Sequence, residues 1–230
     1  MGNATAVCSD KTGTLTENKM TIVSAAIAEL QFTHLYDLGQ WRYNVHPVAM
    51  DLAIEAMAIN STAFEGKGPD GQLKFIGSTT ESAMIEFTQK LGYSYQHIRS
   101  STKVVSVYPF SSEIKSMTTI IQIRENNARS PGRHGDYRLY TKGAAETIVR
   151  HCTHFMDSRG RVRPFSNYAR THHEVLINQY AERSLRTLAL AYRDVDQSTY
   201  KCKFSEIYSL LFCCSSCALF LLCSGIFFKW

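Results

Sequence analysis

Residues 7–16, VCSDKTGTLT, constrain this chain more than any other stretch. A short apolar run over residues 4–8 leads into Asp10, which is followed by a lysine, small hydroxyl residues and one glycine. An acid placed directly after a buried parallel strand lies just outside the sheet, where α/β folds hold their reactive groups. The pattern therefore predicts a strand and loop of an α/β unit, and an ordinary turn after a strand is the alternative.

The residues after Asp10 suit a carboxylate that attacks a phosphoryl group. Such an attack needs cations and hydrogen-bond donors that offset the negative charge gathering on the phosphoryl oxygens. Lys11 provides a cation, and residues 12–14 (TGT) provide N–H and hydroxyl donors in a loop that can wrap around an anion. Asp10 is therefore a candidate nucleophile for covalent catalysis.

This segment resembles the phosphorylation motif of P-type ATPases, which are ion pumps that form an aspartyl-phosphate intermediate. Residues 1–20 are similar to the calcium-pumping branch of the plasma-membrane and fungal vacuolar type. The resemblance implies that Asp10 accepts the phosphoryl group and that Lys11 supports the loop. It also implies that Asp10 and Thr12 are ligands of Mg²⁺.

The composition is that of a folded protein, and the basic residues of segment 124–136 favour a solvated loop, with an anionic ligand as the alternative. The 230 residues are 44% hydrophobic and 20% charged, which is typical of one or two globular domains. The formal charge of +5 is compatible with a nucleotide ligand, and no nucleic-acid-binding motif accompanies the basic residues. Five of the seven cysteines follow residue 200, so Cys8 and Cys152 are interpreted as free thiols.

The expected architecture is α+β, with helices that flank an antiparallel sheet as the resemblance implies, and hydrophobic periodicity indicates the individual elements. Apolar residues recur at three- and four-residue spacing after Pro47 and after Ser78, which indicates helices that each bury one face. A third helix is expected at about 166–184, with His172 and His173 on its surface. Strands are expected at residues 73–76, 104–110, 117–123, 137–141 and 185–194.

Glu81 is the last residue of the segment GSTTE (77–81). Two roles are open for its side chain. Ser78 and Glu81 have the spacing of a capping box at a helix start. The segment is also similar to the G-x-x-T-E motif of calcium pumps, which implies that Glu81 accepts a hydrogen bond from the adenine amino group. Thr79 departs from the lysine that is common in fungal relatives.

Residues 110–117, FSSEIKSM, connect two predicted strands and combine an aromatic ring with a lysine and a methionine. A nucleotide pocket without a P-loop needs a flat apolar face for the base and a cation for the phosphates, and this segment has both. The alternative is an exposed hairpin connection in which one side chain packs into the core. The segment is similar to the family pattern F-x-S-x-x-K-S-M. That resemblance implies that Phe110 stacks on adenine and that Lys115 and Met117 line the pocket.

Lys142 and Gly143 open the segment KGAAE, at a predicted turn from a strand into a helix. Glycine lets a ligand approach the backbone, and a helix N-terminus favours negative charge, so this turn can bind an anionic ligand. An exposed lysine at an ordinary turn is the alternative interpretation. The segment resembles the KGA motif of the family's ATP pocket. Residues 185–194 resemble its LR-x-LALA-x-RD strand, which implies that Arg186 contacts the ATP phosphates.

The tail departs from the family pattern. Residues 207–228 are uncharged and mostly apolar, and they are numerous enough to cross a bilayer. A membrane anchor, a core segment and a translated non-coding extension are the alternatives, of which the third is favoured. The family's TGD and GDG-x-ND segments, which complete the Mg²⁺ site, do not occur in this sequence, so ATP binding without turnover is expected.

These interpretations divide the chain into three parts. Residues 1–22 are predicted to be the first strand and loop of a Rossmann-like, haloacid dehalogenase-like phosphorylation domain, 23–195 a nucleotide-binding domain, and 196–230 a hydrophobic tail. The predicted function is that of a catalytic fragment, on the cytosolic side of a vacuolar or plasma membrane, of an ATP-driven calcium pump that uses ATP and Mg²⁺. Ca²⁺ would be bound only by membrane helices outside this sequence.

Two other function classes are alternatives. A non-catalytic nucleotide-binding or interaction module, free in the cytosol, is the alternative to a catalytic fragment. A dehalogenase-like phosphatase would carry a second acid two residues after Asp10, where Thr12 stands, so the threonine argues for an ATPase.

Overall fold

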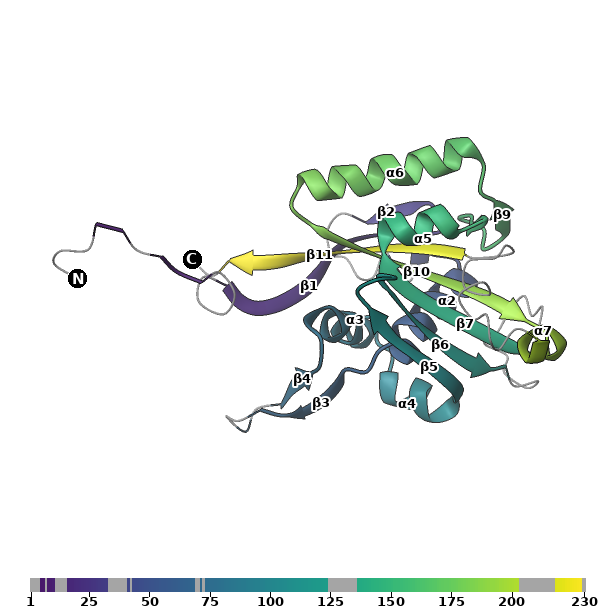
Figure 1. The fold of residues 1–230 in the computed structure, drawn as a ribbon, viewed down its shortest axis with the longest axis horizontal. Helices are drawn as coiled ribbons and strands as arrows, with labels where there is room; N and C mark the ends of the chain where they lie inside the picture. Colours follow the sequence, from purple (N-terminus) through teal and green to yellow (C-terminus); the bar gives the residue numbers. More distant parts are fainter. Residues whose placement is uncertain are drawn as a thin grey trace.

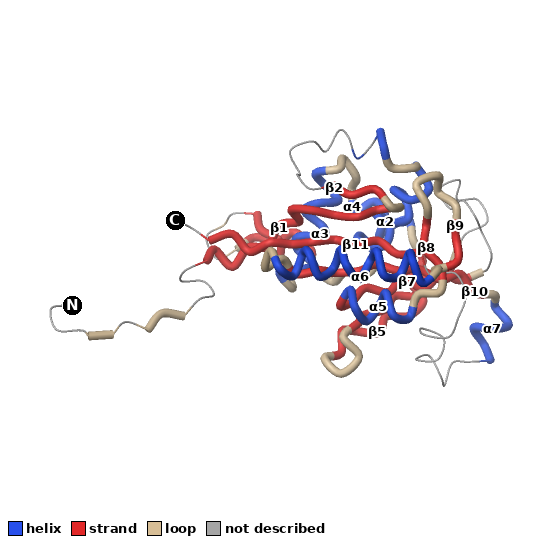
Figure 2. Tube along the Cα trace, turned by 90° about the horizontal axis from the view of Figure 1, so that it is seen from above, coloured by secondary structure: helices blue, strands red, loops and turns tan. Residues whose placement is uncertain are grey.

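The computed structural model describes residues 5–6, 8–10, 16–32, 41, 43–68, 71, 73–123, 136–202 and 218–228. In this part of the chain, helices cover both faces of a long antiparallel sheet, and two short hairpins lie beside it (Figure 1 and Figure 2). The predicted α+β class, with an antiparallel sheet flanked by helices, is therefore confirmed.

The central sheet has seven strands in the order β2-β1-β11-β10-β7-β6-β5, and each neighbouring pair is antiparallel. Its strands are β1 (Thr16–Ile27), β2 (Leu30–Phe32), β5 (Lys103–Ser111), β6 (Ser116–Gln122), β7 (Tyr137–Ala144), β10 (Arg186–Val195) and β11 (Ala218–Phe228). The hairpins are β3 (Phe64–Lys67) with β4 (Leu73–Ile76), and β8 (His154–Met156) with β9 (Val162–Pro164). All strands predicted from the β-rich runs are present, with ends that differ by a few residues.

The helices form two layers. On one side of the sheet lie α2 (Pro47–Ile59), α3 (Thr79–Lys90) and α4 (Tyr95–Ser101), and on the other lie α5 (Ala145–His151) and α6 (Asn167–Glu182) (Figure 1). The short helix α7 (Gln197–Cys202) follows β10. Ser166 caps α6 with its side chain, which accepts a hydrogen bond from the backbone N–H of Ala169 at 3.1 Å.

Alternation along β10 lets one sheet serve both helical layers. Leu190 and Tyr192 pack into the core formed with α2 and α3, whereas Ala189 and Ala191 pack with α5 and α6. Successive strand residues point to opposite faces, so this separation follows directly from the sequence LALAY. The small alanine side chains leave room for α5 and α6 close to the sheet.

Helix α2 differs from its prediction. It buries residues around most of its circumference rather than on one face: Ala49, Met50, Leu52, Ala53, Ile54, Ala56, Met57, Ala58 and Ile59. A helix that is apolar on all sides belongs in a protein interior. This helix contacts β7 and β10 of the sheet as well as α3 and α4, which together cover it.

His173 also differs from its prediction, because it is only 8% exposed, while His172 is exposed as expected. The Nδ1 atom of His173 lies 2.8 Å from the carbonyl oxygen of Ala169, and its ring lies against Phe165. His173 precedes the buried residues Leu176, Ile177 and Tyr180 at helical spacing, which places it on the buried face of α6.

Part of the tail forms a strand inside the sheet. Strand β11 pairs with β1 on one side and β10 on the other, and Leu221 is the partner of both Ala26 and Ala189. No helix in the described ranges is long and apolar enough to span a membrane. Residues 207–217, including Cys214 and Cys217, lie outside the described residues, and the non-coding origin of the tail stays a prediction.

The predicted boundary between residues 22 and 23 lies within β1, which is one strand from Thr16 to Ile27. Residues 5, 6 and 8–10 belong to no helix or strand, and residues 11–15 lie outside the described part of the chain. The strand and loop of a Rossmann-like phosphorylation domain therefore stay a prediction. Within the described ranges, Cys8 and Cys152 form no disulfide bond.

We expect Leu221→Pro to prevent cooperative folding of the sheet, because proline has no N–H and a central strand needs ladder hydrogen bonds on both sides. Leu221→Val keeps the N–H and serves as the matched control. Soluble yield and thermal unfolding followed by circular dichroism measure the effect. Equal melting temperatures of the two variants would contradict the central position of β11.

Candidate functional site

One row of paired residues crosses four strands near one end of the sheet: Ser111 of β5, Ser116 of β6, Gly143 of β7 and Ala189 of β10. Phe110, Lys115 and Lys142 are sequence neighbours of this row, and Arg186 is the first residue of β10. Met117 pairs directly with Lys142. The antiparallel register thus gathers predicted site residues that are far apart in the sequence.

Gly143 is required by a close approach between β7 and the turn before β6. A Cβ atom at Gly143 would lie 2.5 Å from the carbonyl oxygen of Lys115 and 3.0 Å from the Cβ of Ser116. The N–H of Ala144 donates to that same carbonyl at 3.1 Å. Lys115 itself has φ 55°, which lies in the left-handed region, and its side chain is exposed. The backbone contact with β7 therefore fixes the position from which the Lys115 side chain extends into the solvent.

Lys142 and Glu81 form a buried ion pair. The Nζ atom of Lys142 donates to Oε1 of Glu81 at 2.5 Å and to the carbonyl oxygen of Asn60 at 2.6 Å. The two residues are 4% and 7% exposed, so the pair is shielded from water. Lys142 lies within β7, three residues before α5, and the alternative of an exposed lysine at a turn is wrong.

The other carboxylate oxygen of Glu81 is also occupied. Its Oε2 accepts hydrogen bonds from the N–H of Thr62 at 2.9 Å, the hydroxyl of Thr62 at 2.7 Å and the N–H of Ala63 at 3.2 Å. Ser78 makes no side-chain capping hydrogen bond at the start of α3. The capping-box prediction was therefore wrong, because the Glu81 carboxylate is directed to the partners from β7 and the 60–63 segment.

These contacts favour the charged form of both members of the pair. Burial raises the pKa of Glu81, but the Lys142 ammonium and the hydrogen bonds from Lys142 and Thr62 outweigh it, and the net pKa is lowered. Burial lowers the pKa of Lys142, and the Glu81 carboxylate opposes this shift. The pair thus consists of a firmly ionised carboxylate and a lysine whose charge depends on that carboxylate.

Phe110 and Arg186 are exposed, in contrast to the buried pair. Phe110 on β5 is 58% exposed, which is a large apolar surface to leave in water. Lys115 is exposed as well, so an aromatic ring and two cationic side chains face the solvent at this end of the sheet. Such a combination can bind the apolar base and the phosphates of a nucleotide.

Asp10 is exposed in the structure, and the hydroxyl of Ser9 donates to its backbone carbonyl at 3.2 Å. The predicted residues Lys11 and Thr12 lie outside the described part of the chain. The structure therefore assembles the predicted nucleotide-binding residues of the sheet without showing how Asp10 meets them.

Sequence reasoning missed Asn60 and Thr62, which contact the buried pair. The Nδ2 of Asn60 donates to the carbonyl of Met117 at 3.2 Å, and the Thr119 hydroxyl donates to Oδ1 of Asn60 at 2.9 Å. Asn60 is thereby held against β6 at the end of α2. Nothing in the local pattern of the loop indicates these partners, because they come from distant strands.

The sequence model of one family matches residues 49–219, and its description is P-type ATPase, cytoplasmic domain N. The match includes both members of the buried pair and every residue of the row across the sheet. The chain belongs to the P-type ATPase family.

The curated relatives of this P-type ATPase chain carry names of calcium-transporting ATPases. It is 39% identical to calcium-transporting ATPase PAT1 of Dictyostelium discoideum over 90% of this chain and 17% of the relative. It is 38% identical to human plasma membrane calcium-transporting ATPase 4 over 86% of this chain and 16% of the relative. A plasma membrane-type ATPase of Oryza sativa is 34% identical over 86% of this chain and 18% of that protein. The chain thus spans less than a fifth of the length of these relatives.

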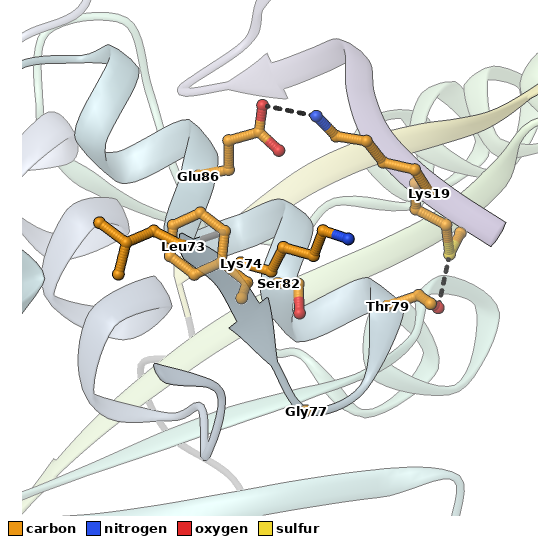
Figure 3. A pocket seen from close by; sticks show the side chains of 9 residues that line it. Lys19, Leu73, Lys74, Gly77, Thr79, Ser82 and Glu86 are labelled. Carbon is orange, nitrogen blue, oxygen red and sulfur yellow. Dashed lines mark hydrogen bonds and ion pairs between the residues drawn. The ribbon is translucent and has the colours of Figure 1, made fainter. Parts of the chain in front are cut away.

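A pocket of about 630 Å³ lies on another side of α3 in this P-type domain (Figure 3). Strand β1 contributes Lys19 to its wall, and α3 contributes Ser82 and Glu86. Within it Lys19 lies 3.5 Å from Glu86, and the Thr79 hydroxyl donates to the sulfur of Met20 at 3.2 Å. Glu81 does not line it, so the pocket is separate from the site described above.

We expect Glu81→Gln to lower the free energy of unfolding by about 3 kcal/mol at pH 7, because Lys142 would stay buried without its partner. A carboxylate with a lowered pKa stabilises the fold above its unfolded pKa of about 4.3, and this contribution is lost as the pH falls toward the folded pKa. The difference between wild type and variant should therefore shrink below about pH 4.

Glu86→Gln is the matched control on the same helix, because Glu86 forms partly exposed ion pairs with Lys19 and Lys90. Such surface pairs contribute about 0–1 kcal/mol. Urea unfolding of the three proteins at pH 7 and pH 3 provides the measurement. An equal loss of stability in both variants would contradict the special role of the buried pair.

Proposed function

We propose that this domain binds ATP at the end of the sheet where the Lys142–Glu81 pair lies beside Phe110 and Lys115. The observation that carries the proposal is this juxtaposition of a buried, hydrogen-bonded ion pair with an exposed aromatic ring and exposed cations. A nucleotide needs an apolar face for its base and positive charge for its phosphates. Both features lie next to one row of paired residues in the sheet.

Each residue has a distinct part in the proposed complex. The ring of Phe110 stacks on the adenine, and the Glu81 carboxylate accepts a hydrogen bond from the adenine amino group. Met117 and Gly143 line the pocket, and the cations Lys115, Lys142 and Arg186 offset the phosphate charge. The backbone contact at Gly143 supports this arrangement, since it holds the Lys115 turn close to β7.

Asp10 is proposed to accept the γ-phosphoryl group of this ATP, with Lys11 supporting the loop. Mg²⁺ would enter as the ATP complex and screen the phosphate charge, with Asp10 and Thr12 as its proposed ligands. Among the described residues, no group of three or more His, Cys, Asp or Glu side chains could hold a metal ion. A carboxylate and a hydroxyl suit a hard cation, and the phosphates would supply further oxygen ligands.

The names of the relatives support calcium as the transported ion of the pump to which the domain would belong. The domain would face the cytosol, where ATP is available, and Ca²⁺ would be handled by membrane helices outside this sequence. We therefore expect the 230-residue chain to bind ATP without steady turnover. A sustained ATPase rate of the purified chain, lost in Asp10→Asn, would contradict this expectation.

We expect Phe110→Ala to weaken binding of a fluorescent ATP analogue by about tenfold or more, because stacking of a base on an aromatic ring contributes roughly 1–3 kcal/mol. Tyr168→Ala removes another exposed aromatic ring, on α6, and is the matched control. Fluorescence titration measures the affinities.

Asp10→Asn is expected to leave nucleotide affinity unchanged in the same titration, because Asp10 would act on the phosphoryl group and not on the base. If Phe110→Ala and Tyr168→Ala bind the analogue as tightly as the wild type, the proposed site is wrong.

A further inference from the structure

Arg99 of α4 binds the backbone segment that joins α2 to β3. Its Nε donates to the carbonyl of Ala58 at 2.7 Å, its Nη1 to that of Ala63 at 2.8 Å and its Nη2 to that of Ser61 at 2.6 Å. All three nitrogens of the guanidinium group are therefore used on one short segment. A planar fork with fixed donor directions can do this, and the single ammonium of lysine cannot.

The segment held by Arg99 carries the partners of the buried pair. Thr62 and Ala63 donate to Oε2 of Glu81, and the carbonyl of Asn60 accepts from Lys142. The carbonyls that Arg99 binds belong to residues 58 and 61, which flank Asn60, and to Ala63, whose own N–H is one of these partners. Movement of the segment would therefore turn the Glu81 carboxylate and release Lys142.

Arg99 is itself held in place by α4. Its guanidinium carbon lies 4.9 Å from the ring centre of Tyr95, and the hydroxyl of Tyr95 accepts a hydrogen bond from the N–H of Glu65 at 3.0 Å. Helix α4 in turn packs against α2 and α3. We call the three hydrogen bonds from Arg99 to the 58–63 segment the Arg99 clamp. This clamp links α4 to the segment that carries Asn60, and through that segment to Glu81 of α3.

The charge of Arg99 also acts on the pair. Burial lowers the pKa of Lys142, the Glu81 carboxylate opposes this, and Arg99 adds to the lowering. Glu81 in turn favours the charged form of Arg99, against the effect of burial. Glu81 thus forms an ion pair with Lys142 of β7 and has a weaker electrostatic influence on Arg99 of α4.

We propose that Arg99 is a positioning residue for recognition of the nucleotide base, which it achieves by fixing the 58–63 segment and through it the Glu81 carboxylate. The inference rests on the proposed function, because Glu81 is the group that would accept a hydrogen bond from the adenine amino group. Arg99 would not touch the nucleotide. Its loss should therefore alter the choice of base more than the affinity for phosphates.

The test compares ATP with ITP, in which an oxo group replaces the adenine amino group. The wild-type chain should prefer ATP, and Arg99→Gln should reduce the ratio of the two affinities by about tenfold, the size expected for a lost hydrogen bond to a charged group. The affinity for ITP should change little. An unaltered ratio in a folded Arg99→Gln variant would overturn the proposal.

Arg170→Gln is the matched control. Arg170 also donates to backbone carbonyls, those of Val149 and Cys152, but it does so on α6 at the opposite face of the sheet. A general loss of stability would affect both variants, whereas the base preference should fall only in the Arg99 variant. Arg99→Lys keeps the charge and loses the fork, and full retention of the preference in this variant would also overturn the proposal.

A second measurement separates this inference from the proposed function. Hydrogen exchange of the Thr62 and Ala63 amides in the nucleotide-free chain should speed up by about tenfold or more in Arg99→Gln and stay unchanged in Arg170→Gln. Unchanged exchange in both variants would overturn the clamp. Absence of nucleotide binding by the wild type, with the exchange effect intact, would overturn the proposed function and the assigned role in base recognition while the clamp itself stood.

Discussion

The buried pair of Lys142 and Glu81 is the interaction on which the arrangement of this domain depends. Removing two charges from water is costly, and the cost is offset only when each charge has enough close partners. Here the ammonium reaches a carboxylate and a carbonyl, and the carboxylate accepts three further hydrogen bonds from the 62–63 backbone and side chain. The groups involved come from α3, β7 and the 60–63 segment that follows α2, so the pair sets the relative positions of these elements.

A second charged cluster lies further along the same face of β7. Arg138 is 1% exposed and makes two hydrogen bonds to Asp194 of β10, at 2.6 and 2.8 Å. Tyr140 donates to Glu55 of α2. Because alternate strand residues share a face, Arg138, Tyr140 and Lys142 all point toward α2. The apolar helix α2 is therefore oriented on the sheet by polar contacts near its middle and at its end.

Buried and exposed residues have different roles in the proposed ATP site. The buried contacts of Glu81 and Lys142 form before any ligand arrives, so little rearrangement is needed on binding. Phe110, Lys115 and Arg186 remain at the surface, where a nucleotide can reach them. Arg99 acts with the buried residues, because its hydrogen bonds to the 58–63 segment fix the shape of the pocket and it would not touch the nucleotide. The sheet supports both groups because strand β11 joins β1 to β10.

The sequence by itself determined the family, five of the strands (β4, β5, β6, β7 and β10) and the buried face of α3, since motif order and apolar periodicity are local properties that one chain displays. It also placed Glu81 at the start of a helix and Arg186 at the start of a strand, as the structure has them. Only the tertiary structure decided that Glu81 is directed to Lys142 rather than to Ser78, that His173 is buried, that part of the tail is a central strand and that Arg99 holds the 58–63 segment. The physical reason is that each of these depends on partners from distant elements, and periodicity reports which face is buried but not what covers it.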